Sequence, residues 1–175
     1  DDPTATDGAT VTDDAVVPHS EHPDPASDTT SDEDPVNAQV EQVGGRVLPI
    51  GTAGDSLTEV SLVVPTFNEA ANIGHLLCSL HAVLTRTGAA FELIVVDDDS
   101  PDRTWEVAAA VASELPGIRV LRRTGASGLA TAVICGWAHA RGAILGVIDG
   151  DGQHPPEVVA DLVTAMETVG QLEKQ

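Results

Sequence analysis

Positive charge is scarce in this sequence of 175 residues. Eight Lys and Arg residues stand against 28 Asp and Glu residues, which gives a formal net charge of −20. A protein that binds the phosphate backbone of nucleic acids needs a basic face, and an anionic membrane surface would repel so acidic a chain. We therefore expect no nucleic-acid partner and no direct attachment to an anionic membrane.

The sequence also lacks long apolar runs and has few cysteines. No stretch of about 18 apolar residues is present, which excludes a membrane-spanning helix, and no signal peptide is visible. The two cysteines, Cys78 and Cys135, are too few for a disulfide framework, and both lie in apolar helical patterns. We expect two reduced, partly buried thiols and a cytoplasmic location.

The acidic residues are distributed unevenly along the chain. Residues 1–42 hold 12 of the 28 acidic residues and no Lys or Arg, with almost no large apolar side chains. Such a segment cannot bury enough surface to offset its ordering entropy, so we predict an acidic disordered tail. Residues 43–60 are interpreted as a lead-in segment with a short strand near 46–50. The folded domain is expected over residues 61–170, followed by a C-terminal tail at 171–175.

From Ser61 onward, short apolar runs alternate with segments in which apolar residues recur at helical spacing. The runs are residues 61–65, 92–97, 118–122 and 143–148, and the expected helices are 73–84, 101–115 (capped by Ser100), 129–137 and 155–166. The side chains expected to face inward from the last three helices are Trp105, Ala108, Ala112, Leu115, Leu129, Val133, Ile134, Trp137, Val159, Leu162, Val163 and Met166. Continuous apolar runs indicate strands covered on both faces. The sequence therefore predicts an α/β fold, with an open, mostly parallel sheet and helices on both faces.

The predicted strand ends carry acidic and amide side chains. Ligands of open parallel sheets bind beyond the carboxyl ends of the strands. At these positions the sequence has Glu69, Asp97, Asp98, Asp99, Asp102, Asp149, Asp151 and Gln153. Turn and capping chemistry explains any one segment, but carboxylates gathered at one edge repel unless a cation or a ligand offsets them. Oxygen ligands of this kind suit Mg²⁺ or Mn²⁺ shared with a diphosphate.

A dinucleotide-binding fold is the competing interpretation. That fold requires a glycine-rich turn after the first strand, where this sequence has Pro-Thr-Phe-Asn-Glu at 65–69. Gly125 and Gly128 follow the third strand, but they lack the full spacing of the dinucleotide fingerprint. The phosphate groups of a ligand would then depend on the metal rather than on a glycine-rich turn.

The sequence is consistent with two roles for several basic side chains. Arg122 and Arg123 end the third strand and could either reach a phosphate or offset the nearby aspartates. His154 follows the last acidic segment and could either bind the metal or cap the last helix. His75 and His81 lie on the polar side of the first helix, where we expect them to be solvated.

Three segments at these strand ends carry a family resemblance. They are Ser-Leu-Val-Val-Pro-Thr-Phe-Asn-Glu-Ala-Ala-Asn-Ile at 61–73, Val-Val-Asp-Asp-Asp-Ser-Pro-Asp-Arg-Thr-Trp at 95–105 and Asp-Gly-Asp-Gly-Gln-His-Pro-Pro-Glu at 149–157. In this order they resemble the family 2 glycosyltransferases of GT-A fold, and among these the dolichyl (polyprenyl) phosphate mannose synthases. Residues 122–142 fit the same branch, and the resemblance covers about residues 60–170. The acidic, lysine-poor composition resembles that of proteins from salt-loving archaea, in which salt screens self-repulsion.

The resemblance implies roles for individual residues. The positions that bind the nucleotide sugar are matched by Pro65, Phe67, Glu69, Val96, Asp98, Asp149, Gly150 and Asp151. Val96 and Asp98 match the positions that receive the base, with Asp98 accepting its N–H groups. The metal positions are matched by Asp149, Asp151 and Gln153, and the ion would be Mg²⁺ or Mn²⁺. No catalytic residue is assigned.

The function implied is transfer of a sugar from a nucleoside diphosphate sugar, GDP-mannose or UDP-glucose, to polyprenyl (dolichyl) phosphate at the cytoplasmic face of the membrane. In the family, the acceptor site and the membrane-associating elements lie beyond the last helix matched here. This chain alone is therefore expected not to turn over. The alternative is a truncated, non-catalytic nucleotide-binding remnant of such an enzyme.

The sequence departs from the family pattern at two places. Gly150 and Gly152 stand where the family has residues with a side chain, and Ala126 and Ser127 stand where it has a basic residue. Because glycine adds backbone freedom, we expect the two glycines to loosen the loop that aims Asp149 and Asp151.

Overall fold

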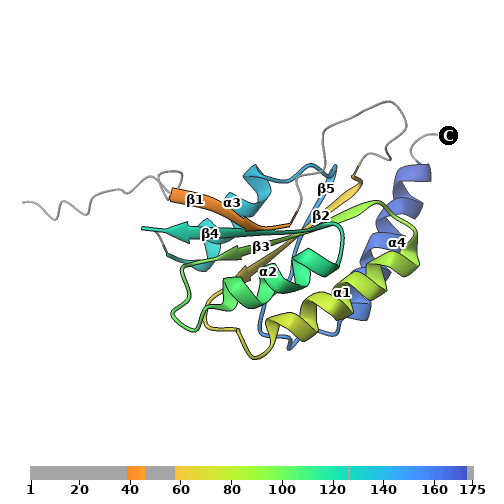
Figure 1. The fold of residues 1–175 in the computed structure, drawn as a ribbon. Helices are drawn as coiled ribbons and strands as arrows, with labels where there is room; N and C mark the ends of the chain where they lie inside the picture. Colours follow the sequence, from red (N-terminus) through yellow and green to blue (C-terminus); the bar gives the residue numbers. More distant parts are fainter. Residues whose placement is uncertain (1–38, 46–57, 126, 173–175) are drawn as a thin grey trace, which may run out of the picture. The chain divides into compact units, whose positions relative to one another are not determined.

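The computed structural model describes residues 39–45, 58–125 and 127–172. These residues form five strands and four helices (Figure 1). In chain order they are β1 (Gln39–Gly44), β2 (Val60–Thr66), α1 (Ile73–Thr87), β3 (Phe91–Asp97), α2 (Thr104–Glu114), β4 (Ile118–Thr124), α3 (Leu129–Ala138), β5 (Ile144–Val147) and α4 (Pro156–Leu172). The strand expected at 46–50 and the acidic segment 1–38 lie outside the described residues.

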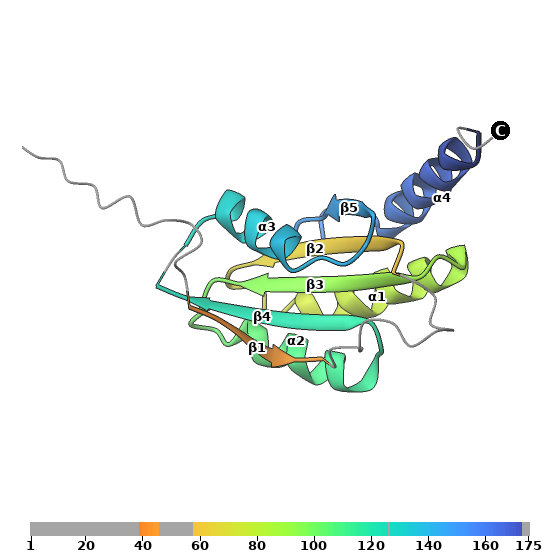
Figure 2. The same cartoon turned by 90° about the horizontal axis from the view of Figure 1, so that it is seen from above.

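The strands form one sheet in the order β1-β4-β3-β2-β5, which can be followed from edge to edge in Figure 2. All neighbouring strands are parallel except β1, which pairs with β4 in the antiparallel direction. The interior strand β2 is buried over its whole length, as continuous apolar runs predict for a strand covered on both faces. The predicted α/β fold with an open, mostly parallel sheet is confirmed.

The predicted boundary of the tail at residue 42 is wrong, because residues 39–42 belong to β1. Their partners on β4 run from Gln39 opposite Thr124 to Gln42 opposite Leu121. Without this strand, the outer edge of β4 would present unpaired backbone N–H and C=O groups. The sequence of β1 contains few apolar residues, so it shows no hydrophobic pattern typical of a strand. An edge strand can form without such a pattern, because it is held by backbone hydrogen bonds more than by buried side chains.

Helices cover both faces of the sheet. Helices α1, α2 and α4 lie on one face, with α4 packed against α1, while α3 packs on β2 and β3 from the other face (Figure 1). The larger core lies under α1, α2 and α4 and includes Leu62, Val64, Leu77, Leu93 and Val95. The smaller core under α3 consists of Val63, Ile94, Val96, Leu121, Ala132 and Cys135.

The predicted inward face of α3 is wrong. Leu129, Ile134 and Trp137 are 63%, 51% and 41% exposed, and the side that faces the sheet presents Ala132, Cys135 and Gly136 instead. A Cβ on Gly136 would lie 2.5 Å from Val63 Cγ1, so the helix packs too closely on the sheet for a larger residue. Close packing through small residues therefore turns the large apolar side chains of α3 outward.

The last helix follows the prediction in part. Val159 and Val163 are buried against the core, whereas Leu162 and Met166 are 61% and 51% exposed and do not face inward. Among the described residues, no helix is both long enough and apolar enough to cross a bilayer. Of the two free cysteines, Cys135 is buried as expected and Cys78 is exposed.

Candidate functional site

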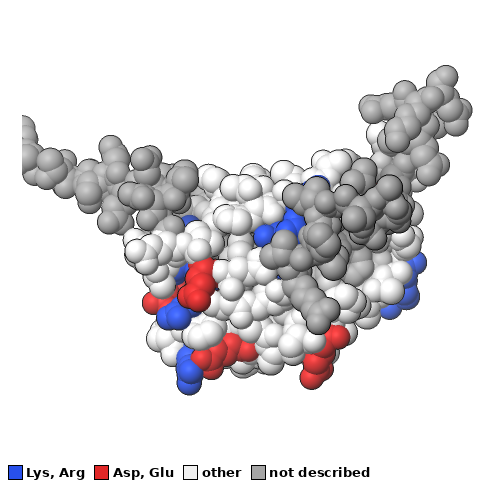
Figure 3. All heavy atoms as spheres, turned by 45° about the horizontal axis from the view of Figure 1, so that its top comes forward, with Lys and Arg blue, Asp and Glu red and all other residues white. Residues whose placement is uncertain are grey.

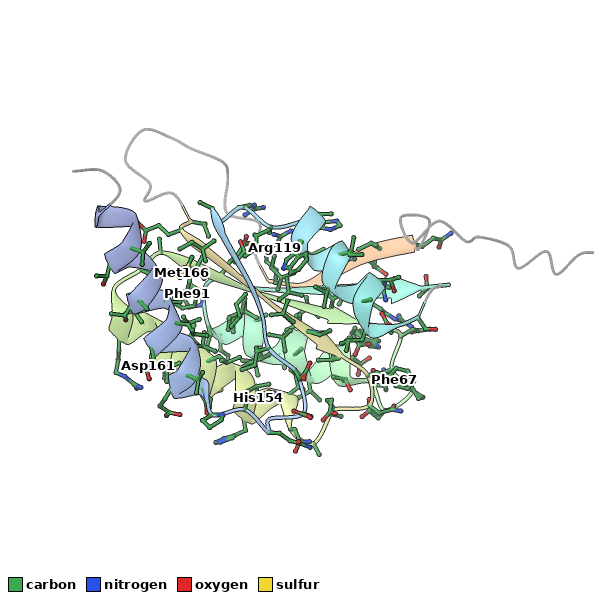
Figure 4. The ribbon with its side chains drawn as sticks, turned by 180° about the vertical axis from the view of Figure 1, so that it is seen from behind. Phe67, Phe91, Arg119, His154, Asp161 and Met166 are labelled. Carbon is green, nitrogen blue, oxygen red and sulfur yellow. The ribbon has the colours of Figure 1, made fainter. Side chains whose placement is uncertain are left out.

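Four loops meet at the carboxyl edge of the sheet. They contain residues 67–72, 98–103, 125 with 127–128, and 148–155, which follow β2, β3, β4 and β5 in turn. Figure 4 shows Phe67 and His154 toward this edge and Arg119 near the opposite ends of the strands. The parallel arrangement thus brings together the segments that the sequence singled out.

The loop after β3 acts as a scaffold for the loop after β2. Three consecutive backbone N–H groups, those of residues 68–70, donate hydrogen bonds to side chains of the β3–α2 segment. The acceptors are Ser100 Oγ at 3.0 Å, Thr104 Oγ1 at 2.8 Å and Asp102 Oδ2 at 3.0 Å. Because Ser100 and Asp102 serve this scaffold, α2 begins at Thr104 rather than at 101. The loop that carries Phe67 and Glu69 is fixed by this contact.

Two of the clustered aspartates accept hydrogen bonds within this scaffold. Asp97 is fully buried and accepts hydrogen bonds from Thr66 Oγ1 (2.9 Å) and from the N–H and hydroxyl of Ser100 (2.9 and 2.7 Å). Asp102 accepts from the hydroxyl and N–H of Thr104 at 2.6 and 3.0 Å. The Thr104 hydroxyl, aided by backbone N–H groups, lowers the pKa of Asp102 below its ordinary value. Turn chemistry accounts for both carboxylates.

Two further aspartates are paired with arginines. Arg123 is fully buried, and its Nε donates to Asp98 Oδ1 at 2.7 Å. Arg122, on the opposite face of β4, pairs with Asp99 and lies over the ring of Trp105, 4.5 Å from its centroid. Acidic and basic side chains accordingly lie side by side on the surface in Figure 3. Of the two interpretations of these arginines, the structure shows the one in which they offset aspartates.

A pocket of about 360 Å³ opens between the loops after β2, β3 and β4. Its lining consists of Pro65, Thr66, Phe67, Asp98, Ser127, Gly128, Leu129 and Ala132. Phe67 is 57% exposed, which leaves its ring available to cover a flat ligand. The far wall is the start of α3, where Gly128 donates its N–H to Asp98 Oδ2 at 2.8 Å. The pocket therefore joins an aromatic ring to a buried carboxylate.

Only some of the residues predicted to bind the nucleotide are found in the lining of this pocket. Pro65, Phe67 and Asp98 do, whereas Val96 is fully buried in the core under α3. Glu69 accepts a hydrogen bond from Asn72 Nδ2 at 2.9 Å. Val96 can therefore support the pocket only from beneath.

Asp149, Asp151 and Gln153 lie in the loop between β5 and α4. Asp151 Oδ1 accepts the N–H of Gln153 at 2.9 Å, and His154 Nε2 lies 3.8 Å from Asp149 Oδ2. Asp151 also borders a second hollow of about 410 Å³ beside α1. The described residues contain no group of three or more His, Cys, Asp and Glu side chains arranged around a metal. The donors here are two carboxylates and one amide oxygen, a set that fits Mg²⁺ or Mn²⁺ completed by ligand oxygens.

The prediction that added glycine loosens this loop is wrong for Gly150. Gly150 is buried, and a Cβ there would lie 2.7 Å from Thr66 Cγ2 and 2.9 Å from the carbonyl oxygen of Pro65. Gly152 has a φ of 72°, a left-handed conformation that glycine adopts without strain. Gly150 is therefore required by the close approach of the loop to β2, and Gly152 by its left-handed backbone conformation.

The sequence-based prediction allowed Arg123 to offset an aspartate, but it did not place this arginine in the core under α3. Arg119, Leu121 and Arg123 alternate along β4, so all three point to the face covered by α3. A signal for this existed, because two arginines at core-facing positions of a strand require buried partners. The partners are Glu92 and Asp98 on the neighbouring strand and its following loop.

Comparison with known proteins defines the family. The sequence pattern of Glycosyl transferase family 2 matches residues 61–171. The chain belongs to this family. It is 45% identical over 109 residues to a dolichol-phosphate mannosyltransferase of Pyrococcus furiosus, a match that covers 62% of this chain and 30% of the relative. A protein of the same name from Saccharomyces cerevisiae is 38% identical over 109 residues, covering 62% of this chain and 41% of the relative.

Solved structures of glycosyltransferases share the fold. A mannosyltransferase from Pyrobaculum calidifontis, solved in complex with GDP-Man and Mn²⁺, matches with a TM-score of 0.54 and 28% identity over 61% of this chain and 31% of that chain. TarS of S. aureus in complex with UDP-GlcNAc matches with a TM-score of 0.52 and 26% identity, covering 63% of this chain and 31% of that one. The family 2 chain described here thus spans about a third of the length of these relatives.

Proposed function

We propose that this family 2 chain binds a nucleoside diphosphate sugar together with Mn²⁺ or Mg²⁺ at the carboxyl edge of its sheet. The reaction proposed for the whole protein is transfer of the sugar, from GDP-mannose or UDP-glucose, to a polyprenyl phosphate. The relatives named dolichol-phosphate mannosyltransferase and the neighbour with GDP-Man and Mn²⁺ support this proposal. The cytoplasmic face of the membrane is the place where a dolichyl phosphate acceptor would be met.

The observation that carries the proposal is the contrast between the acidic groups of the site. Asp98 and Asp99 are paired with arginines, whereas Asp149 and Asp151 have no Lys or Arg partner among the described residues. Two carboxylates in one loop that lack a Lys or Arg partner are stabilised by a hard cation. The cation would neutralise the diphosphate and the charge that develops on it as the sugar leaves.

The chain's own residues supply the other contacts. Phe67 would cover one face of the base, and Asp98 would accept a hydrogen bond from its edge. The backbone of the loop after β2, held by the Ser100–Thr104 segment, would fix the position of Glu69 near the ligand. A polyprenyl phosphate is already ionised, so its attack on the sugar requires positioning rather than a strong general base.

Calorimetry of the 175-residue chain with GDP and UDP in molar salt tests donor binding. We expect binding that depends on Mn²⁺ and that weakens at least about tenfold in Asp151→Asn, since a charge-assisted metal contact is lost. Asp161→Asn is the matched control, because Asp161 is an exposed aspartate on α4 away from this edge (Figure 4). Equal binding with and without metal would contradict the metal assignment, and the absence of heat with either nucleotide would contradict donor binding.

A further inference from the structure

Asp98 has fewer free acceptor positions than a carboxylate usually offers. An ionised carboxylate has about four lone-pair positions, two on each oxygen. In this structure two nitrogens of Arg123 lie against Oδ1: Nε donates a hydrogen bond at 2.7 Å, and Nη2 lies 2.5 Å away as the closest atom of the ion pair. The N–H of Gly128 donates to Oδ2 at 2.8 Å. Oδ1 has no room for a third donor, and one position on Oδ2 remains.

This arrangement is held from three sides. Arg123 is fully buried, and its Nη2 also donates to the carbonyl oxygen of Gly128 at 3.3 Å and to Thr131 Oγ1 at 3.2 Å. The same guanidinium therefore joins the end of β4, the loop after β3 and the first turn of α3. Since the side chain of Asp98 is 7% exposed and lines the pocket, its free position is available only to a ligand in that pocket.

We infer that Arg123 is a positioning residue that restricts Asp98 to a single hydrogen bond with the base of the nucleotide. This inference rests on the proposed function, because it concerns the donor bound in that pocket. The base selected is one with a ring N–H at its recognition edge, as in guanine, hypoxanthine and uracil. Adenine and cytosine present a ring nitrogen lone pair there, which a carboxylate repels.

The inference separates two groups on guanine. The ring N1–H is recognised, while the 2-amino group finds no acceptor on Asp98. Inosine diphosphate lacks only that amino group, so it should bind the unmodified chain within about threefold of GDP, a difference below one hydrogen bond. Adenosine diphosphate should bind at least about tenfold more weakly than GDP, because the buried carboxylate is left without its donor.

The first experiment is calorimetry of the unmodified 175-residue chain with GDP, IDP, UDP and ADP in the presence of Mn²⁺. A preference for GDP over IDP of more than about tenfold would mean that Asp98 has a second open acceptor, and it would overturn the inference. ADP binding as tightly as GDP would overturn it as well. If none of the four nucleotides binds, the proposed function fails and this inference fails with it.

The second experiment changes the positioning residue. Lysine brings a single nitrogen in place of the two that contact Oδ1, so Arg123→Lys should reopen an acceptor position. We expect GDP to gain several-fold over IDP in this variant. Arg119→Lys is the matched control, because Arg119 is also buried on β4 and paired with a carboxylate, but at the other end of the strand.

A general loss of structure would not produce this result. It would weaken GDP and IDP binding equally and leave their ratio unchanged. A folded Arg123→Lys chain with an unchanged ratio would therefore contradict the positioning role. Folding of both lysine variants is checked by their thermal midpoints, and the comparison of the four nucleotides on the unmodified chain tests the inference even if Arg123→Lys does not fold.

Discussion

Two buried arginine–carboxylate pairs cross from β4 to β3, one at each end of the strands. At the amino end, Arg119 donates to Glu92 Oε2 at 3.0 Å, and at the carboxyl end Arg123 pairs with Asp98. The arginine of each pair also donates a hydrogen bond to the backbone at one end of α3. Arg119 binds the carbonyl oxygen of His139 at 2.9 Å, whereas Arg123 binds the first turn of the helix.

The difference between the two pairs lies in what else contacts the carboxylate. Glu92 Oε1 accepts the Ser61 hydroxyl at 2.7 Å and the N–H of Arg141 at 2.8 Å, so the chain itself fills this site. Asp98 keeps one acceptor position open toward a pocket. Ion pairs of the same kind thus hold α3 at one end of the sheet and form the wall of the pocket at the other. Stability and function can therefore be tested separately by matched changes at the two ends.

The largest expected effect comes from removing one arginine. Arg119→Met leaves Glu92, which is 4% exposed, as an unpaired buried charge, and it should lower the free energy of unfolding by about 3–5 kcal/mol. Urea unfolding in molar salt measures this loss. Nucleotide affinity of the folded fraction should stay unchanged, because Arg119 lies at the end away from the pocket.

The double variant Arg119→Met with Glu92→Leu is the control for this prediction. Replacing both charges by apolar groups removes the unpaired carboxylate, so most of the stability should return. A loss below about 1 kcal/mol in Arg119→Met would show that water reaches Glu92 and that the amino-end pair is not equivalent to the pair at Asp98.

Two glycines sharpen the comparison with a smaller effect. A Cβ on Gly142, at the amino end, would lie 2.6 Å from the backbone nitrogen of Ser61, and a Cβ on Gly150, at the carboxyl end, would lie 2.7 Å from Thr66 Cγ2. Either alanine substitution should cost about 1–3 kcal/mol of stability through overpacking. Calorimetry should show weaker nucleotide binding for Gly150→Ala alone, since Thr66 lines the pocket.

The matched control is Gly74→Ala in α1. A Cβ there would meet Val107 Cγ1 at 3.5 Å, an ordinary contact, and alanine favours a helix by about 1 kcal/mol over glycine. This variant should be as stable as the parent or slightly more stable. Equal nucleotide binding in Gly142→Ala and Gly150→Ala would remove the distinction between the two ends.

Truncation of β1 should act on one end only. Its first residues pair with the carboxyl end of β4, with Gln39 opposite Thr124 and Val40 opposite Arg123. A chain that begins at residue 43 should therefore be about 1–2 kcal/mol less stable than one that begins at residue 39, because two or more ladder hydrogen bonds are lost. Hydrogen exchange should increase around Arg123 more than around Arg119. Identical exchange at both positions would contradict a local role for β1.

The fold was largely predictable because the central strands are continuous apolar runs that only a doubly covered sheet explains. The face of α3 was not predictable in the same way. Apolar periodicity favoured Leu129 and Trp137, but the sheet is approached through Ala132 and Gly136, whose small size carries little signal in a hydrophobic pattern. The face of α3 that packs on the sheet depends on the distance between the helix and the sheet, and that distance is set by the tertiary structure.

The candidate site was predictable in its location but not in its internal pairing. Strand ends brought Phe67, Asp98 and Asp151 to one edge, as the parallel topology requires. The sequence gives no register between β3 and β4, so it could not show that Arg123 reaches Asp98 while Arg122 reaches Asp99. The use of Asp97 and Asp102 in the scaffold was likewise hidden, because turn residues and ligand-binding residues are the same chemical types.

The smallest expected effect concerns Asp102, which belongs to the carboxyl end and has no counterpart at the amino end. Hydrogen bonds from Thr104 and from the N–H of Ala70 lower its pKa below the ordinary value of 3.8. Because the folded state favours the ionised form, this stabilisation is complete above the unfolded pKa and disappears as the pH falls through the lower, folded value. Asp102→Asn should therefore lower the thermal midpoint slightly at pH 7, and the difference from the parent should vanish in acid below pH 3.8. The control is Asp161→Asn, which removes an exposed carboxylate on α4 away from this loop. A difference that persists unchanged into acid would mean that the shape of the side chain, rather than its charge, holds the loop after β2.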